Sequence, residues 1–210
     1  MKTLKNKHQT NLRRKVAVEA ASLLYTGQEK EYKQAKLKAA ETLGVRILPS
    51  NREIAEELDR IAEEKEGSTR QELLIQMRKE ALQIMQILKD FHPRLIGSVW
   101  RGTVHKRSDI DIVTFSQDHK AVQAKISENN FKITKTEWLS VTKEGKKQTS
   151  FHIYIVLPSN NEAEVIVKSL EKKDSSEKCE LYGDEMTGLN HMQLQKLLKE
   201  KPAQKFVPDN

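Results

Sequence analysis

Two aspartates, Asp109 and Asp111, are the residues of this chain whose type and spacing point most directly to chemistry. They flank Ile110 in a segment that alternates apolar and polar residues, as a half-buried strand does. Residues two apart on a strand point to the same face, so the two carboxylates repel each other. A divalent cation that prefers hard oxygen ligands, Mg²⁺ or Mn²⁺, removes that repulsion. The pattern therefore predicts a metal site at Asp109 and Asp111, with phosphate oxygens completing the coordination shell.

A Gly97-Ser98 pair lies about ten residues before the aspartates, where another short apolar segment ends. Glycine allows a phosphate to approach the backbone closely, and serine offers a hydroxyl and an N–H group. A short helix is expected to begin here, and its N-terminus favours an anion. Between the two motifs, Arg101, Lys106 and Ser108 are candidates for further phosphate contacts, although a solvated loop explains the two cations equally well. The combination predicts a nucleoside triphosphate held at Gly97 and Ser98 beside the metal.

The stretch from Leu95 to Val113 resembles the signature of the polymerase-beta-type nucleotidyltransferase superfamily: apolar residues, Gly-Ser, a spacer, then acid-apolar-acid-apolar. Its Ser-Asp-Ile-Asp-Ile sequence is similar to that of the minimal and archaeal members, and the whole chain resembles an archaeal group of predicted nucleotidyltransferases. The resemblance implies transfer of a nucleoside monophosphate from an NTP to an acceptor hydroxyl, with Mg²⁺ or Mn²⁺ at Asp109 and Asp111. It leaves the acceptor and the base unspecified.

Members of that superfamily carry a third carboxylate on a later strand, but the expected strand here, residues 148–157, contains no acid. His152 stands where the acid is sought. A histidine can act as a general base or bind a metal, and a structural hydrogen bond explains a half-buried strand histidine about as well. Glu164, on the next strand, is another candidate for the missing carboxylate, and Glu137 is a third. The alternative interpretation is a catalytically weak or inactive protein of this fold that binds nucleic acid or acts as a regulatory partner.

The elements that position these residues follow from the periods of the apolar residues. Helical periods cover the first half of the chain, with capping boxes expected at Ser50-x-x-Glu53 and Thr69-x-x-Glu72. Alternating patterns separated by turn residues dominate the second half. Helices are expected at 10–26, 28–43, 50–66, 69–90 and 118–129 and from about 187 onward, and extended segments at 95–96, 109–115, 131–142, 148–157 and 163–169.

This order of elements predicts an α+β protein in which a small mixed-sheet nucleotidyltransferase domain follows an all-helical basic segment. We place the helical segment at residues 1–66, the nucleotidyltransferase-like domain at 67–200 and a polar tail at 201–210. In the second part, helices are expected to cover one face of the sheet.

The net charge of +7 is concentrated in the first 50 residues, which hold 11 Lys and Arg and 4 Glu. Such a segment suggests a polyanionic partner, because contacts to phosphates release counterions. RNA, in particular tRNA, is therefore the first candidate acceptor, and a protein hydroxyl is the second. A solvated, mobile tail explains the charge equally well.

No run of uncharged apolar residues approaches the roughly 20 that span a bilayer. The N-terminus lacks the apolar core of a signal peptide. The single cysteine, Cys179, excludes an internal disulfide framework. These features predict a cytoplasmic protein without a membrane partner.

Overall fold

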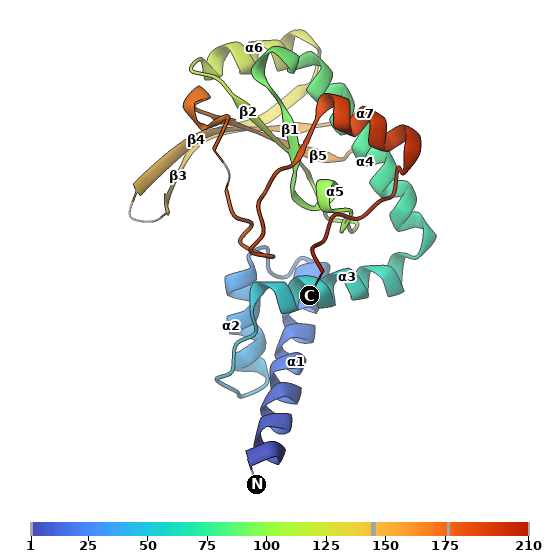
Figure 1. Ribbon diagram of the computed structural model, residues 1–210, viewed down its shortest axis with the longest axis vertical. Coiled ribbons are helices and arrows are strands. Elements are labelled where there is room, and N and C mark those ends of the chain that lie inside the picture. The colour runs from blue at the N-terminus through green and yellow to red at the C-terminus, as the bar shows by residue number, and fades with distance from the viewer. Residues whose placement is uncertain (1, 144–145, 176, 210) are drawn as a thin grey trace. The chain divides into compact units, whose positions relative to one another are not determined.

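The computed structural model describes residues 2–143, 146–175 and 177–209. It confirms the predicted α+β class: a helical region is followed by a six-stranded mixed sheet with helices (Figure 1). The chain forms two compact units. The helical unit comprises Met1–Arg70, His105–Arg107 and Cys179–Asp184, and the sheet unit comprises Gln71–Val104, Ser108–Lys178 and Glu185–Asn210.

The helical unit has a hydrophobic core of its own. Helix α1 (Lys2–Thr26) packs against α2 (Tyr32–Thr42) and α3 (Asn51–Glu66). Helical spacing brings their apolar residues together, and the largest of those that are fully or almost fully buried are Val16, Leu23, Leu24, Tyr25, Ile54, Leu58 and Ile61. From Val16 onward, therefore, α1 is part of a packed unit rather than a solvated tail.

Some of the basic charge of this unit is neutralised internally. Arg13 forms an ion pair with Glu53 at 2.8 Å, and Arg14 forms one with Glu57 at 3.2 Å. The capping box predicted at Ser50 is confirmed, because its side chain accepts from the Glu53 N–H and the Glu53 side chain accepts from the Ser50 N–H.

The second predicted capping box, at Thr69 and Glu72, does not form. Helix α4 (Ser68–Ile87) already begins at Ser68, directly after Gly67, so Thr69 lies inside it. The Thr69 hydroxyl donates to the carbonyl of Glu66 in the preceding helix. The prediction was wrong because it required a longer connection than the single residue that separates α3 from α4.

The sheet has the strand order β3-β4-β5-β2-β1-β6. Strands β2 and β5 pair in parallel, and all other neighbours pair antiparallel. The strands are β1 (Arg94–Ile96), β2 (Ile110–Phe115), β3 (Lys132–Lys143), β4 (Lys146–Val156), β5 (Glu162–Lys168) and β6 (Leu189–Asn190), and the other helices are α5 (Gly97–Arg101), α6 (His119–Glu128), α7 (His191–Glu200) and the 3-10 turns η1 (Lys89–Phe91) and η2 (Leu170–Lys172).

Alternation along the strands gives the sheet two different faces. One face packs against α4, α5, α6 and α7 and forms the main core, in which the central strand residues Leu95, Ile112, Ile153 and Val165 are fully buried. The other face, called the polar face below, carries the residues in between. On β1, β2, β4 and β5 these include Arg94, Ile96, Asp111, Val113, Phe115, His152, Tyr154, Glu162, Glu164, Ile166 and Lys168.

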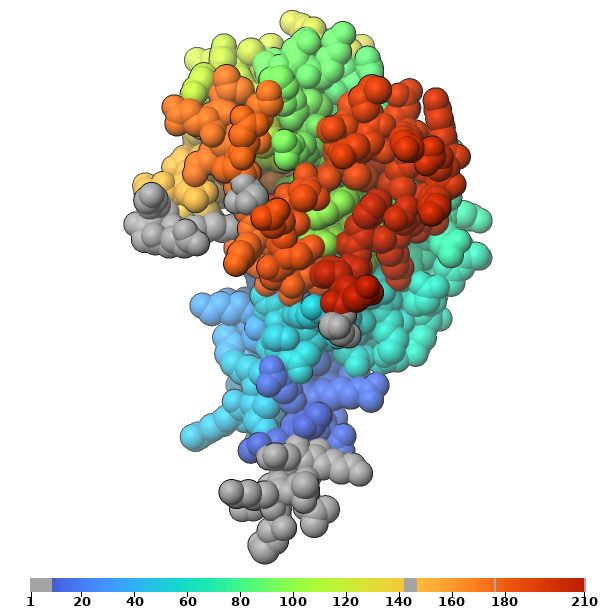
Figure 2. All heavy atoms as spheres, viewed as in Figure 1, coloured from blue at the N-terminus to red at the C-terminus, as the bar shows by residue number. Residues whose placement is uncertain are grey.

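The buried side chain of Arg78 fastens the segment after α7 to the sheet unit. Its guanidinium donates to four backbone carbonyls, those of Val99 (3.1 Å), Trp100 (2.9 Å), Pro202 (2.6 Å) and Gln204 (2.8 Å). Burial lowers the pKa of Arg78 to about 10. Figure 2 shows the C-terminal residues in red on the face in view, beside the green residues around position 100. Arg78 thereby fixes the end of α5, the short helix that begins at Gly97.

None of the helices in the described part of the chain combines the length and apolar character needed to cross a membrane.

Candidate functional site

Four carboxylates gather at one end of the polar face, and we call Asp109, Asp111, Glu162 and Glu164 the carboxylate cluster. Asp111 lies on β2, and Asp109 directly precedes that strand. On the neighbouring parallel strand β5, Glu164 is the register partner of Asp111, and Glu162 lies two residues earlier on the same face. The parallel pairing of β2 with β5 thus brings acids together from positions more than 50 residues apart in the sequence.

Burial, together with the other carboxylates of the cluster, raises the pKa values of Asp109 and Asp111. Burial raises the pKa of Asp111 well above its ordinary value of 3.8, and the charges of Asp109 and Glu164 add to that shift. Asp109 is more exposed, but burial again raises its pKa, helped by Glu164 and Glu162 and opposed by a backbone hydrogen bond. All of the charges that shift these two groups are negative, so ionising both aspartates is costly. A bound cation would offset that cost.

Gly97 lies against the carboxylate of Asp111. Its φ of 69° is in the left-handed region, and a Cβ at this position would overlap the Asp111 carboxyl group. The preceding residue, Ile96, is the register partner of Asp111 across the β1–β2 pair. Glycine is therefore required here by both its backbone conformation and its close approach to Asp111. The N–H groups of Gly97 and Ser98 open α5, where helix geometry provides them with no intrahelical acceptor.

His152 belongs to a hydrogen-bonded chain that ends on Glu164. Its Nδ1 is 2.6 Å from Glu164 Oε1, and its Nε2 is 2.8 Å from Ser150 Oγ. On the same face, the Tyr154 hydroxyl donates to Glu137 at 3.0 Å. Burial acts to raise the pKa of Glu164, but hydrogen bonds from His152 and Tyr154 outweigh it and lower the pKa below its ordinary value. Glu164 is therefore the ionised carboxylate beside Asp111, and His152 orients it.

Arg101, a predicted phosphate contact, lies in other surroundings. It is buried, with 5% of its surface exposed. Its guanidinium donates to the Phe206 carbonyl at 2.8 Å and lies 4.0 Å from the centroid of the Trp100 ring. The Arg101 carbonyl in turn accepts from the Phe206 N–H. These contacts tie α5 to the C-terminal segment.

The two other predicted phosphate contacts, Lys106 and Ser108, belong to different units of the chain. Lys106 belongs to the helical unit, where its Nζ lies 4.9 Å from the Tyr25 ring centroid and its N–H donates to Glu66. Ser108 belongs to the sheet unit and directly precedes Asp109. Gly97, another predicted nucleotide-binding residue, lies directly against the carboxylate of Asp111.

The carboxylate cluster is not a preassembled three-ligand metal site. Within the described residues, no group of three or more His, Cys, Asp or Glu side chains is arranged to hold a metal ion. The predicted ligand set of Asp109, Asp111 and Glu164 is not assembled, and Glu164 Oε1 is engaged by His152. The adjacent aspartates, whose mutual repulsion a cation relieves, suit Mg²⁺ or Mn²⁺ with water or phosphate supplying the other ligands.

Two contributors were not singled out from the sequence. Glu162 carried a usable signal, because it lies two residues before Glu164 in an alternating segment. Arg78 carried none, because a single arginine in an amphipathic helix is ordinarily a surface residue.

These features define an α+β protein whose mixed sheet presents a carboxylate cluster where the parallel strands β2 and β5 meet. Residues 78–204 match the family model described as a domain of unknown function (DUF4269), and the match covers more than half of the 210 residues. The chain therefore belongs to this family. The matched region contains the whole carboxylate cluster, Gly97 and His152. No curated protein matches the chain.

Proposed function

We propose that this protein is a metal-dependent nucleotidyltransferase, which moves a nucleoside monophosphate from an NTP to an acceptor hydroxyl. The observation that carries the proposal is the position of Asp111. It has Gly97 at the end of β1 on one side, Glu164 of β5 on the other, and Asp109 beside it. The similarity of Gly97-Ser98 and Asp109-x-Asp111 to the polymerase-beta-type superfamily supports the same function.

Asp109 and Asp111 would hold Mg²⁺ or Mn²⁺, which when bound screens the negative charge of a triphosphate. Their raised pKa values fit this role, because a bound cation favours the ionised form of both groups. Gly97 and Ser98 offer backbone N–H groups and a hydroxyl to the phosphates. The missing side chain at Gly97 allows that backbone to lie directly against Asp111.

Glu164 is our choice for the third carboxylate. In the proposed reaction, the acceptor hydroxyl gives its proton to Glu164 while its oxygen forms a bond to the α-phosphorus. The bond from that phosphorus to the bridging oxygen breaks, and pyrophosphate leaves with the electron pair. The lowered pKa keeps Glu164 ionised before the reaction, and His152 acts as a positioning residue through its 2.6 Å hydrogen bond.

RNA, including tRNA, is the acceptor that we propose first, and a protein hydroxyl is the second. The support is the net charge of +7, which resides in the first 50 residues. Ion pairs to Glu53 and Glu57 neutralise Arg13 and Arg14, so an RNA contact would use other cations of this segment.

A non-catalytic nucleic-acid-binding protein is the second candidate. It is favoured by the absence, among the residues that the structure describes, of a preassembled group of three metal ligands. It would retain the sheet and the basic helical unit without turnover.

The test is incubation of the protein with each α-³²P-labelled NTP, Mg²⁺ or Mn²⁺, and total RNA. Asp109→Asn/Asp111→Asn removes both charges while preserving side-chain size, and Glu128→Gln, an exposed acid on α6, is the matched control. Label transferred to RNA or protein by the wild type and the control only would support the enzyme and name the acceptor. No transfer with any NTP, together with RNA binding by all three proteins, would favour the non-catalytic binder.

A further inference from the structure

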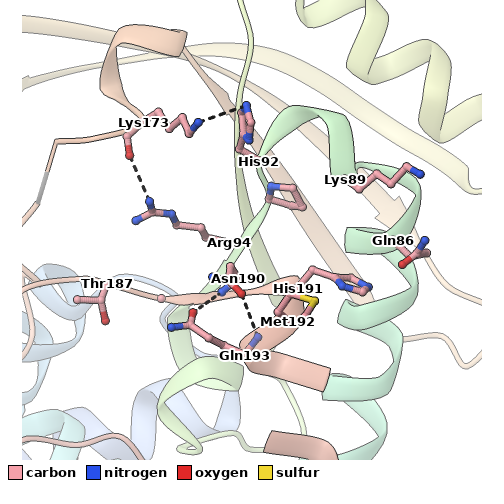
Figure 3. Close-up of a pocket in the computed structure, with 12 residues that line it drawn as sticks. Gln86, Lys89, His92, Arg94, Lys173, Thr187, Asn190, His191, Met192 and Gln193 are labelled. Atoms are coloured by element: carbon pink, nitrogen blue, oxygen red, sulfur yellow. Dashed lines mark hydrogen bonds between the residues drawn. The ribbon is translucent and has the colours of Figure 1, made fainter. Parts of the chain in front are cut away.

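A cavity of about 710 Å³ lies at the other end of β1, within the sheet unit (Figure 3). Its walls come from the end of α4, η1, the start of β1, the residue after η2, and the β6–α7 junction. Small-molecule sites in proteins have volumes of roughly 300–1,000 Å³. The cavity is therefore large enough for a ligand of nucleotide size.

The charged groups that line the cavity are all basic. They are Lys89, Arg94 and Lys173, joined by the imidazoles of His92 and His191, and no Asp or Glu of the described residues lines the cavity. Within the described ranges, none of the three cations forms an ion pair with a carboxylate. Uncompensated charge of one sign in a concave surface attracts a ligand of the opposite sign.

Arg94 and Lys173 are held in place by the fold. The Arg94 guanidinium donates to the Lys173 carbonyl at 3.3 Å and lies 5.9 Å from the centroid of the Phe115 ring. Figure 3 shows Lys173 reaching toward His92, with its Nζ 3.5 Å from His92 Nε2. Lys173 is thereby held beside His92 in the wall of the cavity.

Neutral donors complete the wall at the start of α7. Asn190 and Gln193 form a capping box in which each side-chain oxygen accepts from the backbone N–H of the other residue, both at 2.9 Å. This arrangement leaves the two side-chain NH₂ groups as donors. They stand at the N-terminus of a ten-residue helix, which carries partial positive charge.

The cavity adjoins the carboxylate cluster along one strand. Arg94 and Ile96 are on the polar face of β1, and Ile96 is the register partner of Asp111. Two residues along a strand span about 6.6 Å. Arg94 therefore lies one such step along β1 from the register partner of Asp111.

From this lining we propose that the cavity binds a phosphorylated small molecule, with its phosphate against Arg94 and Lys173 and within reach of the amides of Asn190 and Gln193. Arginine presents a planar fork that matches two phosphate oxygens. The site needs no metal and none of the four acids, so this inference is independent of the proposed transfer reaction.

The test is calorimetric titration at low ionic strength, with EDTA present, using tripolyphosphate, ATP and a short single-stranded RNA as probes. Arg94→Gln/Lys173→Gln removes two cations from the cavity, and Lys120→Gln/Lys199→Gln removes two lysines elsewhere in the sheet unit. We expect the cavity variant to bind tripolyphosphate or ATP at least about tenfold more weakly, and the control to bind as the wild type does. Equal affinity for the two compounds would indicate phosphate recognition alone, and tighter ATP binding would add a nucleoside contact.

Two further variants keep the result interpretable. The Lys89 side chain forms no hydrogen bond or ion pair with the described residues, so Lys89→Gln should weaken binding severalfold without changing the melting temperature. Asp109→Asn/Asp111→Asn should retain binding, which separates this site from the metal site. The proposal would be overturned by no binding of either phosphate compound to the wild type, by equal binding to the wild type and the cavity variant, or by binding of RNA only.

Discussion

The carboxylate cluster and the basic cavity lie toward opposite ends of β1, and their charges are opposite. The charges that shift Asp109 and Asp111 all come from other carboxylates. The cavity is lined by Lys89, Arg94 and Lys173, and no acid among the residues that the structure describes joins them. A chain that needed only stability would pair these charges with one another. Their separation instead leaves two sites of uncompensated charge, a pattern that is common where ligands bind.

Arg78 shows how the same chain treats a charge whose role is structural. Its guanidinium is fully buried, and it donates to four backbone carbonyls. Within the part of the chain that the structure describes, the side chain of Arg94 by contrast makes a single hydrogen bond, at 3.3 Å, and it faces a cavity. The contrast indicates that the remaining donors of Arg94 are available to a ligand.

The largest effect on the acidic side is expected from Gly97→Ala. The added methyl group overlaps the Asp111 carboxylate, and the alanine must adopt a left-handed φ, so we expect a loss of about 3 kcal/mol in the free energy of unfolding. Denaturant unfolding measures this loss. Gly183→Ala is the matched control, because Gly183 also has a positive φ but a methyl group added there would meet no atom within 4 Å. Equal losses in the two variants would show that Gly97 does not constrain Asp111.

Asp111→Asn should instead increase the free energy of unfolding at neutral pH. The folded state raises the pKa of Asp111 above 3.8, so it binds more protons than the unfolded state between that value and the raised one. Stability contributed by the protonated form is lost as the pH rises through the raised pKa. Without metal, Asp111→Asn should therefore add about 1–2 kcal/mol of stability at neutral pH and much less below pH ~4. Thermal unfolding across this range, with EDTA present, would contradict the account if the variant were destabilised at neutral pH.

Unlike Asp111→Asn, Glu164→Gln should decrease the free energy of unfolding at neutral pH. Hydrogen bonds from His152 and Tyr154 lower the pKa of Glu164, so its carboxylate contributes stability above its unfolded pKa that is lost as the pH falls through the folded value. Glu164→Gln should therefore cost about 1 kcal/mol at neutral pH and less in acid. The same melting series tests this. A stabilised Glu164→Gln variant would mean that the ionised Glu164 carboxylate destabilises the folded state, as that of Asp111 does.

The smallest effect on stability is expected from a substitution in the basic cavity. Lys89→Gln removes a cation that forms no hydrogen bond or ion pair with the described residues, so unfolding in ligand-free buffer should change by less than about 0.5 kcal/mol. Adding tripolyphosphate should raise the melting temperature of the wild type more than that of the variant, because a ligand stabilises the state that binds it. Equal shifts in the two proteins would remove Lys89 from the proposed site.

The sequence was sufficient where the signal is local. The alternating pattern placed Asp111 on a strand, with Asp109 directly before it, and the capping box at Ser50 formed as predicted. It was insufficient where a contact depends on strand order. The pairing of Asp111 with Glu164 follows from the parallel β2–β5 neighbours, and a separate hairpin, β3–β4, intervenes in the sequence.

Arg101 illustrates a second limit. In the sequence it stands among basic residues after Gly97-Ser98, a position that suits a phosphate contact. In the structure it is buried against Phe206, more than 100 residues away in the chain. Local pattern cannot predict that the C-terminal segment returns to cover α5.

The most direct test of the central claim is Mn²⁺ binding, measured by electron paramagnetic resonance with a non-hydrolysable NTP analogue present. Wild type and Glu128→Gln are expected to bind Mn²⁺ together with the nucleotide, and Asp109→Asn/Asp111→Asn is expected to lose that Mn²⁺. Equal Mn²⁺ binding by all three proteins, or none by the wild type, would contradict the assignment of the carboxylate cluster as the catalytic metal site.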